Sequence, residues 1–185
     1  MLNDRSDPLA FLATRRSGKP RDLGLPGPSS AELDRMCAIA ARTPDHGKLA
    51  PWRFVVVEDR DRFARLLSDA FRTERPGTGD LAAIEQFAHQ APALVVVLST
   101  PRPSPIPVWE QELSAGAVIM NLLHAANALG FAGGWLTGWA STSALVLAAF
   151  GTPPERIAGF VFIGTPQRAL EERPRPDMAQ LIARW

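Results

Sequence analysis

The feature that most constrains the fold of this chain is a long stretch without a charged side chain. Residues 113 to 136 contain no Asp, Glu, Lys or Arg, and such a stretch is long enough to span a bilayer. Polar residues and glycines interrupt it, however, among them Asn121, His124, Asn127, Gly130, Gly133 and Gly134. A long uncharged helix can also lie at the centre of a large core or bury one face in a subunit interface. We favour the interface helix over the membrane span.

The overall composition is that of an ordinary globular protein. The 185 residues fit one domain, residues 1–185, and are long enough to bury a substantial core. With 46% hydrophobic and 21% charged residues the chain is not a disordered one. A net charge of +1 gives no reason to expect nucleic acid or an anionic membrane as a partner. Because the N-terminal segment lacks a secretory hydrophobic stretch, we expect a cytoplasmic protein.

Helical and extended segments mix along the chain without strict alternation. A capping box at Ser29 and Glu32 predicts the start of one helix, and a β-branched run after Phe54 predicts a buried strand. Apolar spacing predicts further helices over 8–16, 61–72, 81–89, 108–129 and 142–150, and further strands over 93–98, 131–137 and 157–163. This order predicts an α+β domain with a small mixed sheet.

Arg15, Arg16 and Ser17 follow the first predicted helix and form the first polar cluster. Arginine gives bidentate, charge-assisted hydrogen bonds to phosphate, and serine adds another donor. Lys19 and Arg21 strengthen the positive field. Basic side chains at the end of a helix can equally complement its dipole, so the residues alone leave both interpretations open.

The second cluster is a loop from Arg42 to Trp52 that contains two prolines. Prolines fix φ and bias the preceding residue toward extended backbone, so the loop is stiff. His46 follows Asp45, which suggests a catalytic pair, but no nucleophile accompanies them, because Cys37 lies on an apolar helix face. The three histidines are too widely spaced to favour a zinc site. Asp45 can form an Asx-turn and His46 can be an exposed loop residue, so both interpretations remain open.

The third cluster runs from Gly130 to Gly138 and is rich in glycine. Glycines let a planar ligand approach the backbone, although such turns also serve packing alone. No Rossmann or Walker A pattern accompanies it.

Together the clusters resemble the FMN-dependent nitroreductase family, in particular its short bacterial branch of NAD(P)H nitroreductases. The motifs occur in the family's order along most of the chain: Arg15-Arg16-Ser17, then Arg42-x-Pro-Asp-His46 with Leu49-x-Pro-Trp-x-Phe54, then Trp109-Glu-Gln-Glu-x-Ser-Ala-Gly116, then Ala126-x-x-x-Gly130-Phe with Trp135-x-x-Gly138, and finally Gly159-Phe-x-x-Ile-Gly-Thr-Pro166. The set of five is specific, whereas any single motif is weak.

The resemblance implies a homodimer with a central mixed or antiparallel sheet flanked by helices and a long central helix in the dimer interface. It implies FMN as cofactor, held by Arg15, Arg16, Ser17, Trp135, Leu136 and Thr137, with Arg42 and His46 contacting the same flavin from the partner subunit. The branch's nicotinamide-nucleotide segment would match Ala126, Asn127, Ala128, Leu129, Gly130 and Phe131.

The implied activity is an oxidoreductase that uses NADH or NADPH to reduce nitro compounds, quinones or similar small-molecule acceptors by ping-pong hydride transfer through flavin. Flavin carries the redox chemistry, so the protein needs no side-chain acid or base. A flavin-binding or storage protein on the same fold is the alternative. A small membrane-associated regulatory protein, suggested only by the uncharged stretch, is a third.

Overall fold

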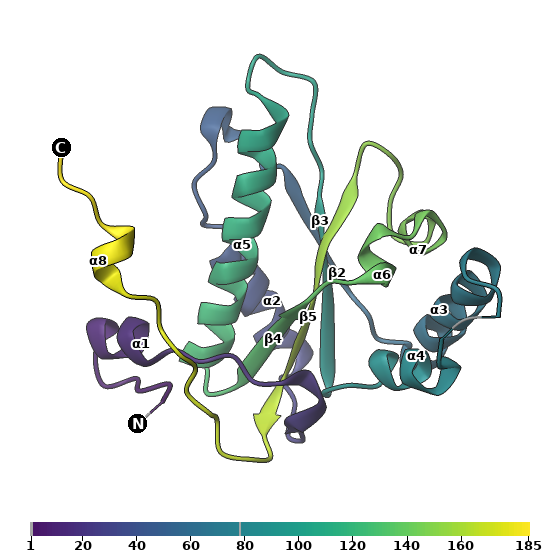
Figure 1. Ribbon diagram of the computed structural model, residues 1–185, viewed down its shortest axis with the longest axis horizontal. Helices are drawn as coiled ribbons and strands as arrows, with labels where there is room; N and C mark the ends of the chain where they lie inside the picture. Colours follow the sequence, from purple (N-terminus) through teal and green to yellow (C-terminus); the bar gives the residue numbers. More distant parts are fainter. Residues whose placement is uncertain (1, 78) are drawn as a thin grey trace.

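The computed structural model describes residues 2–77 and 79–185 and shows a five-stranded sheet between two layers of helices (Figure 1). The strands are β1 (Leu23–Gly24), β2 (Trp52–Val56), β3 (Ala93–Ser99), β4 (Ala132–Leu136) and β5 (Arg156–Pro166). They are ordered β1-β5-β3-β2, with β4 also paired to β5, and the four pairings between these described strands are antiparallel. The predicted α+β fold is confirmed.

The two faces of β3 show why the helices form two layers. On one face, Val95 and Val97 pack in a buried cluster with α2 (Ser30–Ala40) and the long helix α5 (Val108–Ala128). On the other, Leu94, Val96 and Leu98 pack with α3 (Arg60–Glu74), α4 (Leu81–Ala88), α6 (Trp139–Thr142) and α7 (Ala144–Ala148). Successive side chains of a strand point to opposite faces, so a continuous apolar run fits a strand covered on both sides.

The capping box in the sequence predicted the start of α2 correctly. In α2 the Ser29 hydroxyl accepts from Glu32 N at 3.3 Å, and the Glu32 carboxylate accepts from Ser29 N at 2.8 Å, as the capping box predicts. One segment differs: the helix predicted over 142–150 is two short helices, because Ser143 has extended backbone and caps α7.

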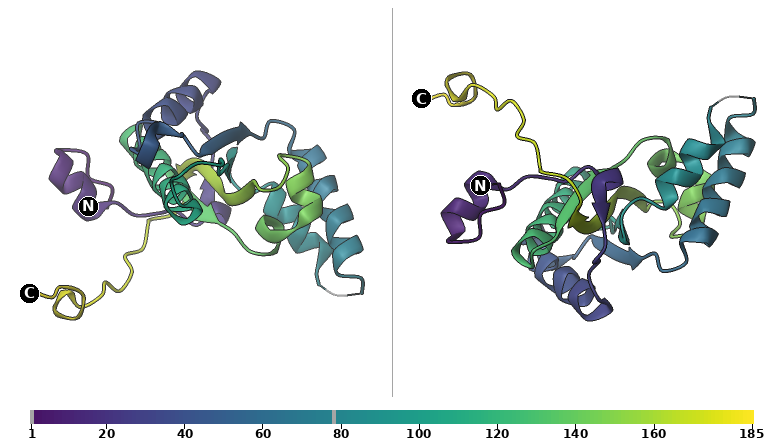
Figure 2. Two further views of the ribbon diagram at one scale, coloured as in Figure 1. Left: turned by 90° about the horizontal axis from the view of Figure 1, so that it is seen from above. Right: turned by 90° about the horizontal axis from the view of Figure 1, so that it is seen from below.

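The two ends of the chain lie on the α5 side of the sheet and project away from it (Figure 2). Helix α1 (Pro8–Thr14) begins at Asp7, whose carboxylate accepts from two backbone amides, and ends two residues before the predicted boundary. The tail after β5 is extended except for the short helix α8 (Met178–Leu181).

Helix α5 carries most of the uncharged stretch. Its inner side, which includes Val118, Ile119 and Leu122, is fully buried, whereas Trp109 and Leu113 are 61% and 64% exposed. Within residues 2–77 and 79–185, no helix combines the length and apolar character needed to cross a membrane. The exposed apolar side chains suit the expected subunit interface, which stays a prediction.

Candidate functional site

The segment that contains Arg15, Arg16 and Ser17 lies across β4 beside the central sheet. Gly18 N donates to the Gly133 carbonyl at 3.1 Å, which ties the segment to the strand. A Cβ on Gly134 would lie 2.7 Å from the Gly18 carbonyl oxygen and 2.9 Å from the Pro20 ring. Glycine at position 134 therefore allows this close contact of two backbones, and the contact brings the basic cluster beside the glycine-rich strand.

A cavity of about 550 Å³ opens where these two segments meet α5, and we call it the main cavity. Its size is within the range of roughly 300–1,000 Å³ that is typical of small-molecule sites. It is lined by Arg16, Ser17, Gly18, Lys19, Pro20, Arg21, Gln90, Met120, Leu123, Gly134, Trp135 and Leu136. The lining combines cations and a hydroxyl at one part with apolar side chains and bare backbone at another.

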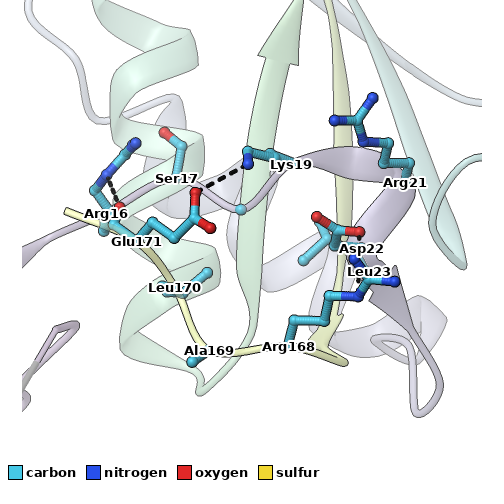
Figure 3. A pocket seen from close by; sticks show the side chains of 11 residues that line it. Arg16, Ser17, Lys19, Arg21, Asp22, Leu23, Arg168, Ala169, Leu170 and Glu171 are labelled. Atoms are coloured by element: carbon cyan, nitrogen blue, oxygen red, sulfur yellow. Dashed lines mark hydrogen bonds and ion pairs between the residues drawn. The ribbon is translucent and has the colours of Figure 1, made fainter. Parts of the chain in front are cut away.

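A smaller pocket of about 130 Å³, the basic pocket, shares Arg16, Ser17, Lys19 and Arg21 with the main cavity (Figure 3). The tail after β5 forms its other wall. Lys19 Nζ lies 3.0 Å from a Glu171 carboxylate oxygen, and Arg16 Nε donates to the Glu171 carbonyl at 2.7 Å. Glu171 therefore contacts Arg16 and Lys19, the cations for which the sequence predicts a bound phosphate.

Arg15 is half-buried and is not among the residues that line either pocket. Its Nη1 donates to the Ser17 hydroxyl at 3.3 Å. Burial lowers the pKa of Arg15, and the nearby charges of Arg175 and Arg16 lower it further. Because several cations crowd one place, a bound anion would relieve their mutual repulsion. Arg175, in the tail after β5, is thus close enough to Arg15 to add a further cation to this cluster.

Trp135 and Leu136 line the main cavity, whereas Thr137 is exposed and outside the lining. The Trp135 indole Nε1 donates to the Ala158 carbonyl at 3.0 Å. A Cβ on Gly159 would overlap that indole nitrogen, so the indole lies directly against this part of β5. The absence of a side chain at Gly159 therefore leaves the space that the Trp135 indole occupies.

The loop from Arg42 to Trp52 lies beside the other end of α5. His46 Nδ1 is 2.8 Å from Glu110 in the first turn of that helix. Helix α1, which leads into the basic cluster, contacts α5 at His124 instead: the Phe11 ring packs edge-on against the His124 ring, with 5.7 Å between the ring centroids. Fourteen residues separate Glu110 from His124, about 21 Å of helix at 1.5 Å per residue. Within one chain, His46 therefore lies far from the basic cluster.

Much of this loop has a structural role. The Asp45 carboxylate accepts from the amides of Leu49 (2.5 Å) and Ala50 (3.2 Å), so its role is structural, but these bonds reach four and five residues along the chain and do not form the Asx-turn that the sequence suggested. The Thr43 hydroxyl is buried and accepts from Asn121 of α5 at 2.6 Å. Arg42 and His46 themselves remain exposed and face away from the core.

The segment predicted to contact the nicotinamide nucleotide forms the end of α5 and the turn into β4. Ala126 and Asn127 are buried, and Asn127 Nδ2 donates to the Phe131 carbonyl at 3.0 Å, closing the turn. Ala128 and Gly130 are exposed, and Leu129 and Phe131 are partly buried. Nucleotide binding by this segment stays a prediction.

Lining residues that lie outside the three sequence clusters were missed by the sequence analysis, namely Gln90, Met120 and Leu123. Met120 and Leu123 lie on the uncharged helix, and their spacing of three residues was the available signal. Gln90 lies in the connector between α4 and β3, where nothing local distinguishes it. In the part of the chain that the structure describes, no group of three His, Cys, Asp or Glu residues could hold a metal ion.

Comparisons with known proteins agree on the family. The sequence pattern that defines the nitroreductase family matches residues 12–165. A Haemophilus influenzae protein named "putative NAD(P)H nitroreductase" is 36% identical over 174 residues, 91% of this chain and 94% of the relative.

Solved structures show the same fold. A nitroreductase-like family protein from Bacillus cereus superposes with a TM-score of 0.83 at 21% identity, covering 98% of this chain and 97% of the other. A nitroreductase-type protein from Desulfovibrio desulfuricans, solved in complex with FMN, has a TM-score of 0.74 at 20% identity, covering 97% and 98%.

Proposed function

The chain belongs to the nitroreductase family, and from that premise we propose that it is an FMN-dependent oxidoreductase that takes electrons from NADH or NADPH. Its acceptors would be nitro compounds, quinones or similar small molecules. The observation that carries the proposal is the main cavity, where the basic cluster meets the glycine-rich strand and an apolar helix face.

The residues present fit this cofactor chemically. A phosphate needs cations and a hydroxyl, and Arg15, Arg16 and Ser17 lie together beside the basic pocket. A planar ring system needs a slot with apolar walls and accessible backbone, and Gly134, Trp135 and Leu136 of β4 line the main cavity together with Met120 and Leu123 of α5. The charged and apolar ends are continuous, because the two pockets share four charged or polar side chains.

Bound FMN would supply the redox chemistry, taking a hydride from the nucleotide and passing electrons to the acceptor. The protein's task is to bind and orient. Arg15, Arg16 and Ser17 would hold the phosphate, and Lys19, which lines both pockets, would stabilise negative charge on the reduced ring. Donor and acceptor would use the same cavity in turn, which gives ping-pong kinetics.

We propose further that Arg42 and His46 reach the cofactor of a second subunit. In its own chain His46 lies about 20 Å along α5 from the basic cluster, at the standard rise per residue, whereas Arg42 adjoins Thr43, which accepts from Asn121 farther along that helix. A homodimer that packs the exposed apolar side of α5, with Trp109 and Leu113, against its copy would bury that surface and bring the loop of one chain toward the cavity of the other.

Mixed dimers test this arrangement. One chain carries Arg15→Ala with Ser17→Ala, and the other carries Arg42→Ala with His46→Ala, each with a different affinity tag. If the loop comes from the partner, the mixed dimer has one intact site and one doubly damaged site, so it retains tight binding of one FMN per dimer. If both clusters serve the same chain's site, neither site is intact and tight binding is lost.

Anaerobic mixing separates the oxidoreductase from a flavin-storage protein on the same fold. Bleaching of bound flavin by NADH or NADPH, followed by its recovery with a quinone, supports the enzyme. Bound flavin that neither nucleotide reduces supports the storage function instead.

A further inference from the structure

Arg60, the first residue of α3, holds the connector between α4 and β3. Its Nε donates to the Ala88 carbonyl at 2.6 Å, and its Nη2 donates to the Gln90 carbonyl at 2.7 Å. The centre of its guanidinium lies 5.6 Å from the ring of the buried Phe162 on β5. One side chain thus joins the start of α3, the end of α4 and the central sheet.

The surroundings of Arg60 are unusual for an arginine. Burial lowers its pKa to about 10, so the group is still protonated at neutral pH. Within residues 2–77 and 79–185, no carboxylate forms an ion pair with it, and its buried Nη1 has no hydrogen-bond partner. Burying a charge without an ionic partner costs free energy, and the two hydrogen bonds that Arg60 makes go to the last residue of α4 and to Gln90 of the connector.

The connector has few bonds of its own. Helix α4 ends at Ala88, and carbonyls in the last turn of a helix have no partner within the helix. Ala91 has a φ of +54°, a region that alanine rarely adopts, and Pro92 has no N–H to donate. The neighbouring Asp61 adds a contact of 3.5 Å to His89. The first turn of α3 therefore fixes a segment that its local sequence leaves weakly determined.

The connector matters because Gln90 lines the main cavity. Among the described lining residues, Arg16, Lys19 and Arg21 can only donate hydrogen bonds from their side chains, the Ser17 hydroxyl already accepts from Arg15, and the Trp135 indole already donates to the Ala158 carbonyl. An amide side chain donates and accepts at adjacent atoms. The pyrimidine edge of a flavin carries an N–H between two carbonyl groups, which a single amide can match.

We propose that Gln90 contributes an amide contact to the flavin site and that Arg60 is the positioning residue that holds Gln90 in place. The inference rests on the proposed cofactor. It assigns two residues to the site that lie outside the motifs by which the family is recognised in this sequence.

Four variants test the proposal: Gln90→Ala, Arg60→Met, Arg60→Lys and the double variant Arg60→Met/Gln90→Ala. The measurements are the dissociation constant of FMN, from titration of the apoprotein, and the reduction potential of the bound flavin. Gln90→Ala weakens FMN binding about five- to tenfold, the effect of one hydrogen bond. Arg60→Met gives a similar loss alone and almost none in the Gln90→Ala background, because both changes remove the same contact. Arg60→Lys restores part of the affinity.

Arg62→Met is the matched control. Arg62 lies two residues along the same helix and is exposed, so its loss leaves the FMN affinity and the flavin potential unchanged. Should Arg60→Met fail to fold, Gln90→Ala and Arg60→Lys still decide the matter.

Two results overturn the proposal. One is Gln90→Ala with wild-type FMN affinity and potential. The other is an Arg60→Met variant that unfolds at lower temperature but binds FMN with unchanged affinity and potential, which would make Arg60 a purely structural residue. Both differ from failure of the proposed function, in which the unaltered protein itself would not bind FMN.

Discussion

Replacing Gly134 by alanine tests whether the close contact between β4 and the basic segment builds the cofactor site. The added Cβ would lie 2.7 Å from the Gly18 carbonyl oxygen and 2.9 Å from two atoms of the Pro20 ring. Neither neighbour is the flexible end of a side chain, so the backbone of one segment must move by about half an ångström or more to restore van der Waals contact.

The expected cost follows from that displacement. Overpacking of this kind destabilises by about 1–3 kcal/mol, and loss of the 3.1 Å bond from Gly18 N to the Gly133 carbonyl adds about 1 kcal/mol. The same movement takes Ser17 and Lys19 away from the cavity wall, so we expect FMN affinity to fall about tenfold or more.

Urea unfolding of the apoprotein measures the first effect, and FMN titration measures the second. Gly133→Ala is the comparison, because its Cβ would lie 2.7 Å from the end of the Leu123 side chain, which can rotate, and 3.3 Å from a backbone atom, the Phe162 carbonyl oxygen. We expect a smaller loss of FMN affinity in that variant. A Gly134→Ala protein with the stability and FMN affinity of the unaltered protein would refute the reasoning.

Three further predictions follow from individual contacts. Glu171→Gln removes the carboxylate 3.0 Å from Lys19 Nζ, so FMN binding at low salt tightens by up to about fivefold, whereas unchanged affinity would show that the contact does not compete with the cofactor. Burial raises the pKa of Cys37 to about 11, so iodoacetamide labels the folded protein at pH 8 about 100-fold more slowly than the urea-unfolded one; equal rates would contradict its placement. Burial and the nearby Arg15 lower the pKa of His124, so the unfolded state binds the proton more readily. The free energy of unfolding therefore falls as the pH drops below about 6.5. Urea titrations of His124→Gln should show a weaker fall with pH, and an identical fall would exclude this histidine as the cause.

Local sequence signals predicted the elements that local physics determines. The Ser29 and Glu32 capping box and the apolar run of β3 needed only neighbouring residues, and both are confirmed. The prediction of a single helix over 142–150 was wrong, and a distant residue contributes to the break. The Ser143 hydroxyl donates to Glu74, which lies 69 residues earlier in the chain. The short helix α8 has no buried residues, so the sequence contains no hydrophobic pattern from which it could be predicted.

The sequence motifs predicted which segments form the site but not which distant residues contact them. Arg16, Ser17, Trp135 and Leu136 line one cavity, as a shared cofactor site requires. The contact of His46 with Glu110 joins residues 64 positions apart, and that of Lys19 with Glu171 joins residues 152 apart. Such pairs depend on the tertiary fold, which single-sequence periodicity does not encode.

The central claim is that this protein is a flavin-dependent NAD(P)H oxidoreductase, and one measurement tests it most directly. Purified protein is loaded with FMN, freed of excess cofactor and mixed anaerobically with NADH or NADPH in a stopped-flow spectrometer. The account predicts about one FMN bound per chain, with a flavin absorbance that at least one nucleotide bleaches and a quinone or nitro compound restores. Protein that remains colourless after incubation with FMN would contradict it.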